Sequence, residues 1–422
     1  MNYIDLFAGA GGLSEGFIRA GCTPVAHIEM NNDAVNTIRT RIAYYFLKSK
    51  NKLDIYNSYL KNEITRDELY RLIPKEKLNT AMCIKLSQEN IQDVFKEIDK
   101  SIKGEREIDF IIGGPPCQAY SLVGRSIKLA KDKIKIKNNE NITDDPRNYL
   151  YKLYFQFLSK YKPKAFVFEN VTGLLTAQKG KFYNDFVNLA KSIGYTVDNR
   201  ILKAEDYGVL QSRRRVIIVG WREDINEKYP EFIKRKLSCT INEMFSDLPN
   251  LCPGEEKKDY SSPPCEYLIK SGIRTINDNI LTKHVSRPQL ERDREIYRLV
   301  IRAWNDGHTR IHYDNLPEYL KTHKNRKSFV DRFKIVEGDT GTCHTMMAHI
   351  SKDGHYFIHP DINQARSLSV REAARIQSFP DNYFFEGSRT AAFTQIGNAV
   401  PPLMAEVIAK ELVKILKKHC KQ

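Results

Sequence analysis

Apolar positions in the first half of the chain alternate between short runs and longer stretches with helical spacing. The short runs, typical of buried strands, occupy residues 3–7, 23–29, 108–112, 165–168, 195–202 and 216–221. Apolar residues three or four positions apart occupy residues 13–20, 32–46, 149–158 and 182–193. Strands that alternate with helices indicate βαβ units, so the pattern predicts an α/β fold with a Rossmann-like, mostly parallel sheet.

This periodicity ends near residue 222, where turns rich in Pro and Gly begin. Residues 47–78 are interpreted as an inserted helical segment. Residues 401–418 have helical spacing again, and the two prolines at their start suit the first turn of a helix. The sequence therefore predicts three parts: a first domain over residues 1–225, a smaller irregular domain over 226–365, and a return segment over 366–422 whose helix completes the first domain.

Composition narrows the class of protein. The chain has 422 residues, a formal net charge of +15 and 41% apolar residues, which excludes collagen-like, coiled-coil and wholly disordered chains. The sequence shows no run that could span a bilayer and no secretion signal, so we expect a cytoplasmic protein with no membrane partner and with reduced thiols. The positive charge favours a polyanionic partner, and nucleic acid is the best candidate.

A glycine-rich turn follows the first strand. Gly9, Gly11 and Gly12 let the backbone approach a ligand at a helix N-terminus. Glu29 ends the second strand, where a doubly wound fold places an acid to bind the ribose hydroxyls of an adenosine cofactor. NAD and S-adenosylmethionine both present an adenosine, so this pattern alone leaves both open.

Candidate chemistry also follows later strands. Pro115 and Pro116 stiffen the chain before Cys117, which favours a nucleophile over a buried structural thiol. Glu169 directly follows the strand predicted over residues 165–168, where its carboxylate can act as an acid or a hydrogen-bond partner. Alternation in an extended chain puts Gln211, Arg213 and Arg215 on one face, which we interpret as a substrate cradle. Residues 395–402 are interpreted as a Gly/Asn turn that could bring the end of the chain back to the first sheet. The spacing of His and Cys fits no common metal site.

Taken in order, these segments resemble the DNA (cytosine-5)-methyltransferase family. The resemblance rests on DLFAGAGGLSEGF, GGPPCQAYS, FVFENVTGLL, QSRRRVIIVG, RSLSVREAARIQSFPDNY and QIGNAVPPLMAEVIAKEL, and covers about residues 3–220 and 366–412. The thiol after PP argues for methylation at a ring carbon, because amino-directed DNA methyltransferases carry an aromatic residue there.

The resemblance implies a role for each matching residue. Cys117 is the expected nucleophile, Glu169 contacts the target base, and Gln211, Arg213 and Arg215 support the catalytic pocket. The expected cofactor is S-adenosylmethionine, and no metal is implied. The residues expected around it are Phe7, Gly9, Gly11, Gly12, Glu29, Met30, Asn90, Ile91, Pro115, Asn398 and Ala399. Asn90 stands where the family usually has an acid, and Asp93 is the alternative.

The resemblance also implies how DNA is used. A cytosine is extruded from duplex DNA into the pocket, and the second domain reads the sequence. A basic stretch at 126–137 closes on the phosphates, and residues 344–354 are interpreted as a hairpin that faces DNA. We expect a monomer, with a cognate restriction endonuclease acting separately. The alternatives are a tRNA substrate, a catalytically silent DNA-binding regulator, and an NAD-dependent oxidoreductase that leaves Cys117 and Glu169 without a role.

Overall fold

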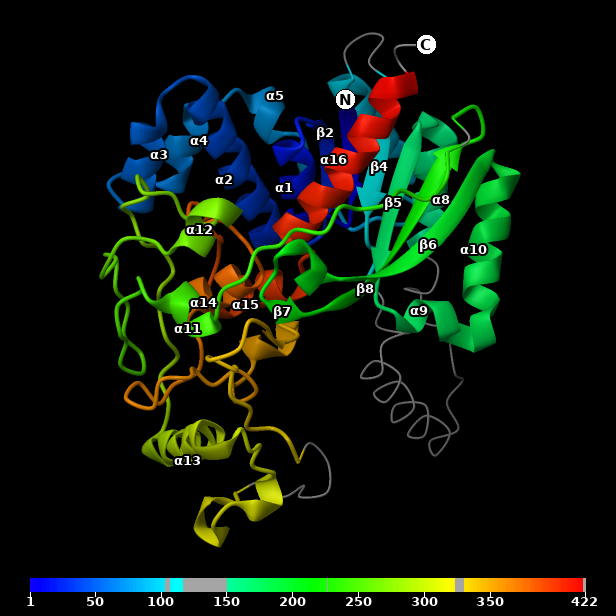
Figure 1. Ribbon diagram of the computed structural model, residues 1–422. Helices are drawn as coiled ribbons and strands as arrows, with labels where there is room; N and C mark the ends of the chain where they lie inside the picture. The colour runs from blue at the N-terminus through cyan, green and yellow to red at the C-terminus, as the bar shows by residue number, and fades with distance from the viewer. Residues whose placement is uncertain (103–106, 117–149, 226, 323–329, 420–422) are drawn as a thin grey trace, which may run out of the picture.

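The computed structural model describes residues 1–102, 107–116, 150–225, 227–322 and 330–419. A seven-stranded sheet forms its upper half (Figure 1). The strand order is β3-β2-β1-β4-β5-β8-β6. These strands are β1 (Asn2–Leu6), β2 (Thr23–Glu29), β3 (Ala81–Cys83), β4 (Phe110–Gly113), β5 (Ala165–Asn170), β6 (Tyr195–Lys203) and β8 (Arg214–Arg222). A separate two-stranded ladder joins β7 (Gln211–Ser212) to β9 (Cys343–His344).

The sheet is mostly parallel, as the sequence predicts, and β8 is the antiparallel strand. The link from β6 to β8 is too short for a crossover, which needs a dozen or more residues, so β8 must return antiparallel. Leu6 pairs with Ile28 on one side and with Gly113 on the other. The carboxyl ends of β1, β2 and β4 therefore meet at one edge, where ligands bind in folds of this kind.

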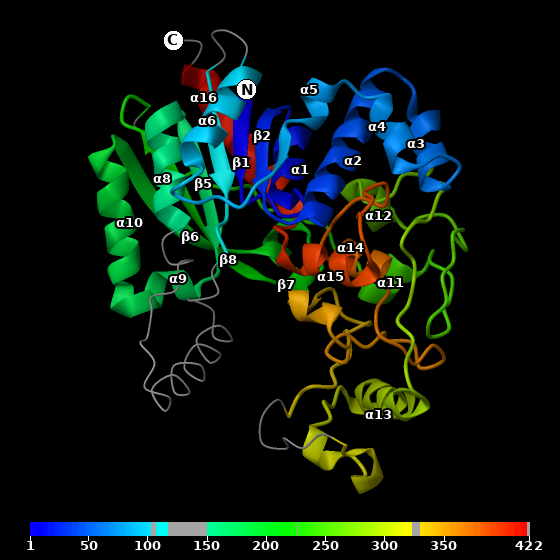
Figure 2. The ribbon, with the colours of Figure 1, turned by 180° about the vertical axis from the view of Figure 1, so that it is seen from behind.

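Helices cover both faces of the sheet. Helices α1 (Gly12–Arg19) and α16 (Pro402–His419) pack on one face, in a core that includes Phe17 and Leu403. Helices α6 (Ile91–Ser101), α8 (Leu150–Tyr161) and α10 (Lys181–Ser192) pack on the other, seen from behind in Figure 2. The short helix α9 (Gly173–Thr176) follows β5. The last helix, α16, therefore packs against α1 near the start of the chain.

The helical insertion predicted over residues 47–78 is confirmed. Helix α2 (Asn32–Ser49) is capped by Asn31, whose Oδ1 accepts a hydrogen bond from the backbone N–H of Ala34 at 3.0 Å. It continues into α3 (Leu53–Leu60), α4 (Arg66–Arg71) and α5 (Lys75–Leu78), which share a small core with the end of α2.

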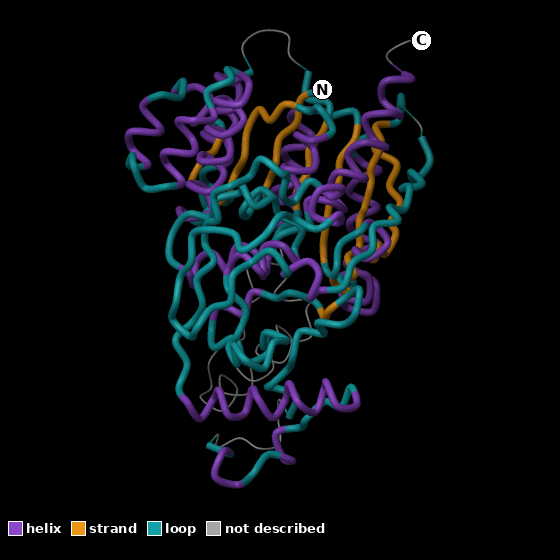
Figure 3. Tube along the Cα trace, turned by 60° about the vertical axis from the view of Figure 1, so that its left-hand side comes forward, coloured by secondary structure: helices purple, strands orange, loops and turns teal. Residues whose placement is uncertain are grey.

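The described residues between 241 and 398 form mainly helices and loops below the sheet (Figure 3). Their α-helices are α11 (Ile241–Phe245), α12 (Glu266–Ser271), α13 (Glu291–Gly307), α14 (Val370–Ile376) and α15 (Arg389–Asn398). One core joins residues between 241 and 281, between 336 and 357, and between 368 and 399, and it also takes in Ala10 and Leu210. A second core surrounds α13 at the lower tip. Among the described residues, no helix is long and apolar enough to cross a membrane.

One local prediction is wrong in part, and a second is wrong. Of the residues 395–402 predicted as a turn, 395–398 are the last turn of α15, because Ser388 caps the helix and Phe393 and Ile396 are buried along one face, and 399–401 link this helix to α16. Residues 344–354 do not form a hairpin. Cys343 and His344 pair in parallel with Gln211 and Ser212, and Ala348–Ser351 form a 3-10 turn, because the partner strand comes from elsewhere in the chain.

Candidate active site

The glycine-rich turn between β1 and α1 is a chain of left-handed backbone conformations. Phe7, Gly9 and Gly11 have φ values of 58°, 55° and 77°. Residues with a side chain rarely adopt these φ values, so glycine is favoured at positions 9 and 11, and the backbone of Phe7 is strained. A β-carbon at position 9 would have no heavy atom within 4 Å. The outer side of the turn is therefore open, as a ligand that approaches the backbone requires.

Glu29 lies against this turn. Its Oε2 accepts a hydrogen bond from the backbone N–H of Gly9 at 2.9 Å, and its Oε1 accepts one from the N–H of Asn31 at 2.8 Å. The structure thus joins the acid to the turn. Met30, the next residue, is 63% exposed.

The end of α15 and the residues after it form the wall behind the turn. A β-carbon on Gly12 would lie 2.3 Å from the carbonyl oxygen of Val400, so only glycine permits this approach. Tyr383 donates from its hydroxyl to the carbonyl oxygen of Ala10 at 2.5 Å. Sequence reasoning gave Tyr383 no role, although it ends the SFPDNY motif. Asn398 is exposed and Ala399 is buried beside it.

Asn90, which stands where an acid was expected near the third strand, lies in the loop between β3 and α6. Strand β3 ends at Cys83, and Asn90 lies just before α6. Its Oδ1 accepts from the N–H of Ser87 at 2.9 Å and its Nδ2 donates to the carbonyl of Lys85 at 2.8 Å. Its polar atoms are therefore engaged in the local loop, while Ile91 is fully buried. Asp93 forms an exposed ion pair with Lys96.

The residues after β4 pass directly against β5. A β-carbon on Gly114 would lie 2.7 Å from Oε2 of Glu169 and 2.8 Å from its carbonyl oxygen. Asn170 donates from Nδ2 to the carbonyl of Pro115 at 3.2 Å. Glu169 and Asn170 thus fix the path of the chain up to Pro116. Cys117 and the basic stretch at 126–137 lie outside the described residues.

Arg215 completes this corner of the site. Its Nε lies 2.8 Å from Oε1 of Glu169, and the two side chains are 16% and 13% exposed. The pair is partly buried and the distance between its nitrogen and oxygen is short, so the guanidinium fixes the direction of the carboxylate. Of the three residues predicted to share a face, Arg215 forms the ion pair with Glu169.

Gln211 and Arg213 have different surroundings. Both are buried, and both bond to the backbone of Met346. Gln211 also donates to the carbonyl of Ile376 at 3.0 Å. Arg213 also donates to the carbonyls of Gly397 and Ala399, at 3.3 and 2.9 Å. Burial, and after it the nearby charge of Arg215, lowers the pKa of the Arg213 guanidinium well below its ordinary value.

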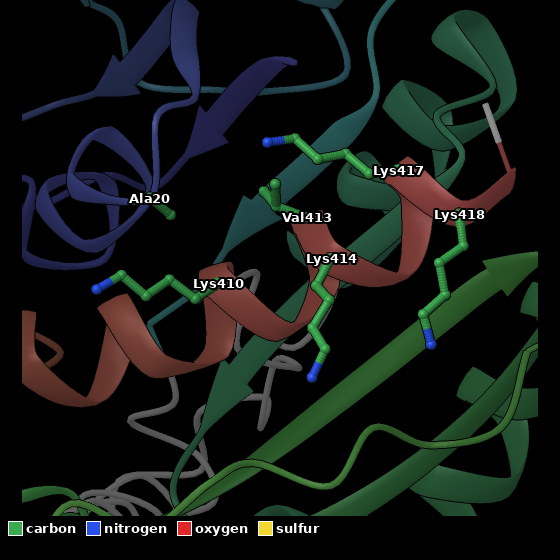
Figure 4. A pocket seen from close by; sticks show the side chains of 6 residues that line it. All are labelled: Ala20, Lys410, Val413, Lys414, Lys417 and Lys418. Atoms are coloured by element: carbon green, nitrogen blue, oxygen red, sulfur yellow. The ribbon is translucent and has the colours of Figure 1, made fainter. Parts of the chain in front are cut away.

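A hollow lies elsewhere, on the outer side of α16. It has a volume of about 490 Å³ and is lined by the lysines at positions 410, 414, 417 and 418 together with Ala20 and Val413 (Figure 4). The lysine side chains extend outward from the helix, and Lys410 and Lys414 are paired with Glu406 and Glu411. None of the site residues predicted from the sequence lines this hollow.

Comparison with known proteins gives consistent matches over nearly the whole chain. The family described as C-5 cytosine-specific DNA methylase matches residues 1–69 and 75–414. The type II methyltransferase M.Bpa9945I of Bacillus paralicheniformis is 43% identical over 459 aligned positions, covering 99% of this chain and 100% of the relative. The type II methyltransferase M.AgeI of Thalassovita gelatinovora is 29% identical and covers 98% and 99% of the two chains.

Solved structures resemble the fold. A chain from an Escherichia coli prophage, described as a candidate DNA modification methyltransferase, superimposes with a TM-score of 0.62 at 22% identity over 99% of both chains. The methyltransferase EhMeth of Entamoeba histolytica gives a TM-score of 0.52 at 16% identity and covers 99% and 98% of the two chains. At these identities the likeness shows the shared α/β fold alone.

Proposed function

The chain belongs to the C-5 cytosine-specific DNA methylase family, and from this membership we propose that it transfers the methyl group of S-adenosylmethionine to carbon 5 of a cytosine in duplex DNA. The observation that carries the proposal is the Glu169–Arg215 pair, held against the chain that leads into Cys117. Target base, nucleophile and cofactor then meet at the carboxyl ends of β1, β4 and β5.

The turn and its surroundings fit an adenosine-containing cofactor. The space beside Gly9 is open, and each Glu29 oxygen accepts one backbone N–H and keeps a lone pair for a ribose hydroxyl. S-adenosylmethionine, when bound, supplies an electrophilic methyl group on a sulfonium. The residues proposed to hold it are Phe7, Gly9, Gly11, Gly12, Glu29, Met30, Asn90, Ile91, Pro115, Asn398 and Ala399.

Cys117 is the proposed nucleophile. Carbon 5 of cytosine is weakly nucleophilic, and addition of the Cys117 thiolate to carbon 6 converts the ring to an enamine whose electron pair resides on carbon 5. After carbon 5 has been methylated, a base removes its proton. The electrons of that C–H bond restore the ring double bond, the sulfur–carbon bond breaks, and the thiolate leaves.

Glu169 and Arg215 act on the charge that this addition creates. We assign Glu169 to ring N3, where a shared proton disperses the negative charge, and Arg215 to the exocyclic O2. The ion pair between them keeps both groups in place before the base arrives, so little reorganisation is needed during reaction.

Duplex DNA is the proposed substrate, and a stacked cytosine cannot reach Cys117. Extrusion of the base costs a few kcal/mol of stacking and pairing. Residues 226–365 are proposed to read the sequence around the target. The named relatives are type II methyltransferases, so we propose that this protein modifies DNA as a monomer and protects it from a separate cognate restriction endonuclease.

Methyl transfer tests the proposal. Purified protein should move labelled methyl from S-adenosylmethionine to duplex DNA as 5-methylcytosine. Cys117→Ala should abolish transfer, whereas Cys252→Ala, at an exposed cysteine, should not. DNA with 5-fluorocytosine at the target should trap a covalent adduct, because fluorine cannot leave as a proton does. Undiminished activity of Cys117→Ala would remove the mechanism.

A second assay separates the possible substrates. Methyl incorporation into duplex DNA and into tRNA is compared at equal concentrations, and incorporation into tRNA alone would contradict the assignment to DNA. Bisulfite sequencing of DNA from cells that express the protein then identifies the recognised sequence.

A further inference from the structure

Two side chains at the junction of β7 and β8 fix the backbone of one distant residue. Gln211 accepts through Oε1 from the N–H of Met346 at 3.0 Å, and Arg213 donates from Nη1 to the carbonyl of Met346 at 2.7 Å. Thr345 donates from its hydroxyl to the carbonyl of Ser212. Together with the β7–β9 ladder, these bonds attach residues 343–346 of the second domain to the chain that leads into Arg215.

The same guanidinium also holds the wall behind the glycine-rich turn. Arg213 donates from Nη2 to the carbonyls of Gly397 and Ala399, which flank the exposed Asn398. The wall also touches the 343–348 segment directly, because a β-carbon on Gly397 would lie 2.3 Å from the backbone nitrogen of Ala348. One side chain therefore links the segment from the second domain to the wall.

Packing alone does not explain an arginine at this position. Arg213 is 1% exposed, and among the described residues it forms no ion pair, since the carboxylate of Glu169 pairs with Arg215. The charge is balanced by backbone carbonyls instead of an acid. A buried cation of this kind stabilises a fold no better than a well-packed apolar side chain. The planar fork of the guanidinium, however, fixes its donors relative to one another.

We propose that Arg213 is a positioning residue that couples cofactor binding to DNA binding. The inference rests on the proposed function, because its two ligands are those of the proposed reaction. Cofactor contact at Asn398 orders the carbonyls on either side of it, and the rigid fork transmits that order to the backbone of Met346. By thermodynamic linkage, DNA that orders residues 343–348 strengthens cofactor binding by the same factor.

The coupling is measured by titration calorimetry with S-adenosylhomocysteine, in the presence and absence of a saturating duplex that carries the recognised sequence. In the unmodified protein we expect the duplex to tighten S-adenosylhomocysteine binding about 10-fold or more. Arg213→Lys keeps the charge but loses the fork, and its coupling factor should fall below about 3-fold. Arg214→Ala, at the exposed neighbour, should keep the full factor. Equal coupling in Arg213→Lys and the unmodified protein overturns the inference.

Hydrogen exchange tests the coupling in the unmodified protein, so its result does not depend on whether Arg213→Lys folds. Hydrogen exchange of the unmodified protein reports the Met346 amide, whose proton is bonded to Gln211. S-adenosylhomocysteine alone should slow exchange in the peptide that contains Met346, and an unchanged rate contradicts the proposal. If both ligands bind without coupling, this inference alone fails. If neither binds, the proposed function fails.

Discussion

Gly114 and Glu169 are so close that a β-carbon on Gly114 would lie 2.7 Å from the carboxylate oxygen Oε2. The carboxylate therefore occupies the space that any other residue at position 114 would fill. The glycine in GGPPC is thus a steric requirement of the acid that follows β5, and the two motifs depend on each other.

Gly114→Ala should impair catalysis. The added methyl group would meet Oε2 of Glu169 at 2.7 Å and the carbonyl oxygen of Glu169 at 2.8 Å, which displaces the acid from Arg215. The proposed stabilisation of charge on the base is then lost, and we expect kcat to fall about 100-fold. Steady-state methyl transfer measures the effect, and circular dichroism checks the fold. Gly307→Ala, at the exposed end of α13, is the matched control. Wild-type kcat in Gly114→Ala would show that this contact does not matter.

Glu29→Ala should weaken cofactor binding. The change removes the acceptor for the Gly9 and Asn31 N–H groups and the proposed partner of the ribose. Hydrogen bonds to a charged group contribute roughly 1.5–3 kcal/mol, which corresponds to roughly 10- to 100-fold in affinity for S-adenosylhomocysteine. Calorimetry measures the affinity for S-adenosylhomocysteine, and Glu63→Ala, at an exposed residue, is the control. Equal affinities of Glu29→Ala and wild type would exclude Glu29 from the cofactor site.

Tyr383→Phe should loosen the glycine-rich turn. The Ala10 carbonyl loses the hydroxyl donor that bonds it at 2.5 Å, and an unpaired buried acceptor costs about 1–3 kcal/mol. We expect a lower free energy of unfolding and a higher KM for S-adenosylmethionine. Urea titration and initial rates test the two effects. Tyr319→Phe, which alters an exposed tyrosine, should leave KM unchanged.

Stability should fall as the pH falls from 6.5 toward 4. Burial lowers the pKa of His27 from 6.5 to about 4, and burial with the charge of Arg366 lowers that of His359 to about 3. In this window the unfolded chain binds more protons than the folded one, so the free energy of unfolding is fully present above pH 6.5 and is lost on acidification. Each histidine contributes at most about 1.4 kcal/mol per pH unit.

Urea titrations across this range measure the slope. His27→Gln should reduce it, because glutamine does not titrate and can still bond to Ser14, the partner of the ring at 2.8 Å. An identical slope in His27→Gln would mean that His27 is not neutral in the folded protein.

DNA affinity should depend steeply on salt. With a net charge of +15, the protein should neutralise several phosphates. Six to ten such contacts would lower affinity roughly 10³- to 10⁵-fold between 50 and 200 mM salt. Fluorescence anisotropy of a labelled duplex gives the slope of log K against log salt. A flat dependence would argue against phosphate contacts as the source of affinity.

The sequence by itself determined the sheet and the strand-end residues of the site. Short apolar runs fix where strands end, and parallel strands bring those ends to one edge, so Gly9, Glu29, Gly114 and Glu169 could be expected close together from their positions alone. The N-cap residue Ser388 is a sequence signal for the start of α15. The turn predicted over residues 395–402 nevertheless overlapped residues 395–398, the end of that helix.

Only the tertiary structure decided where Gln211 and Arg213 point. Alternation along an extended chain predicted one shared face with Arg215, but their partners, Met346, Ile376 and Ala399, lie more than 130 positions away. Local periodicity reports which side of a strand a residue occupies. It carries no information about which distant backbone will fill the space on that side, because that depends on how the second core packs against the sheet.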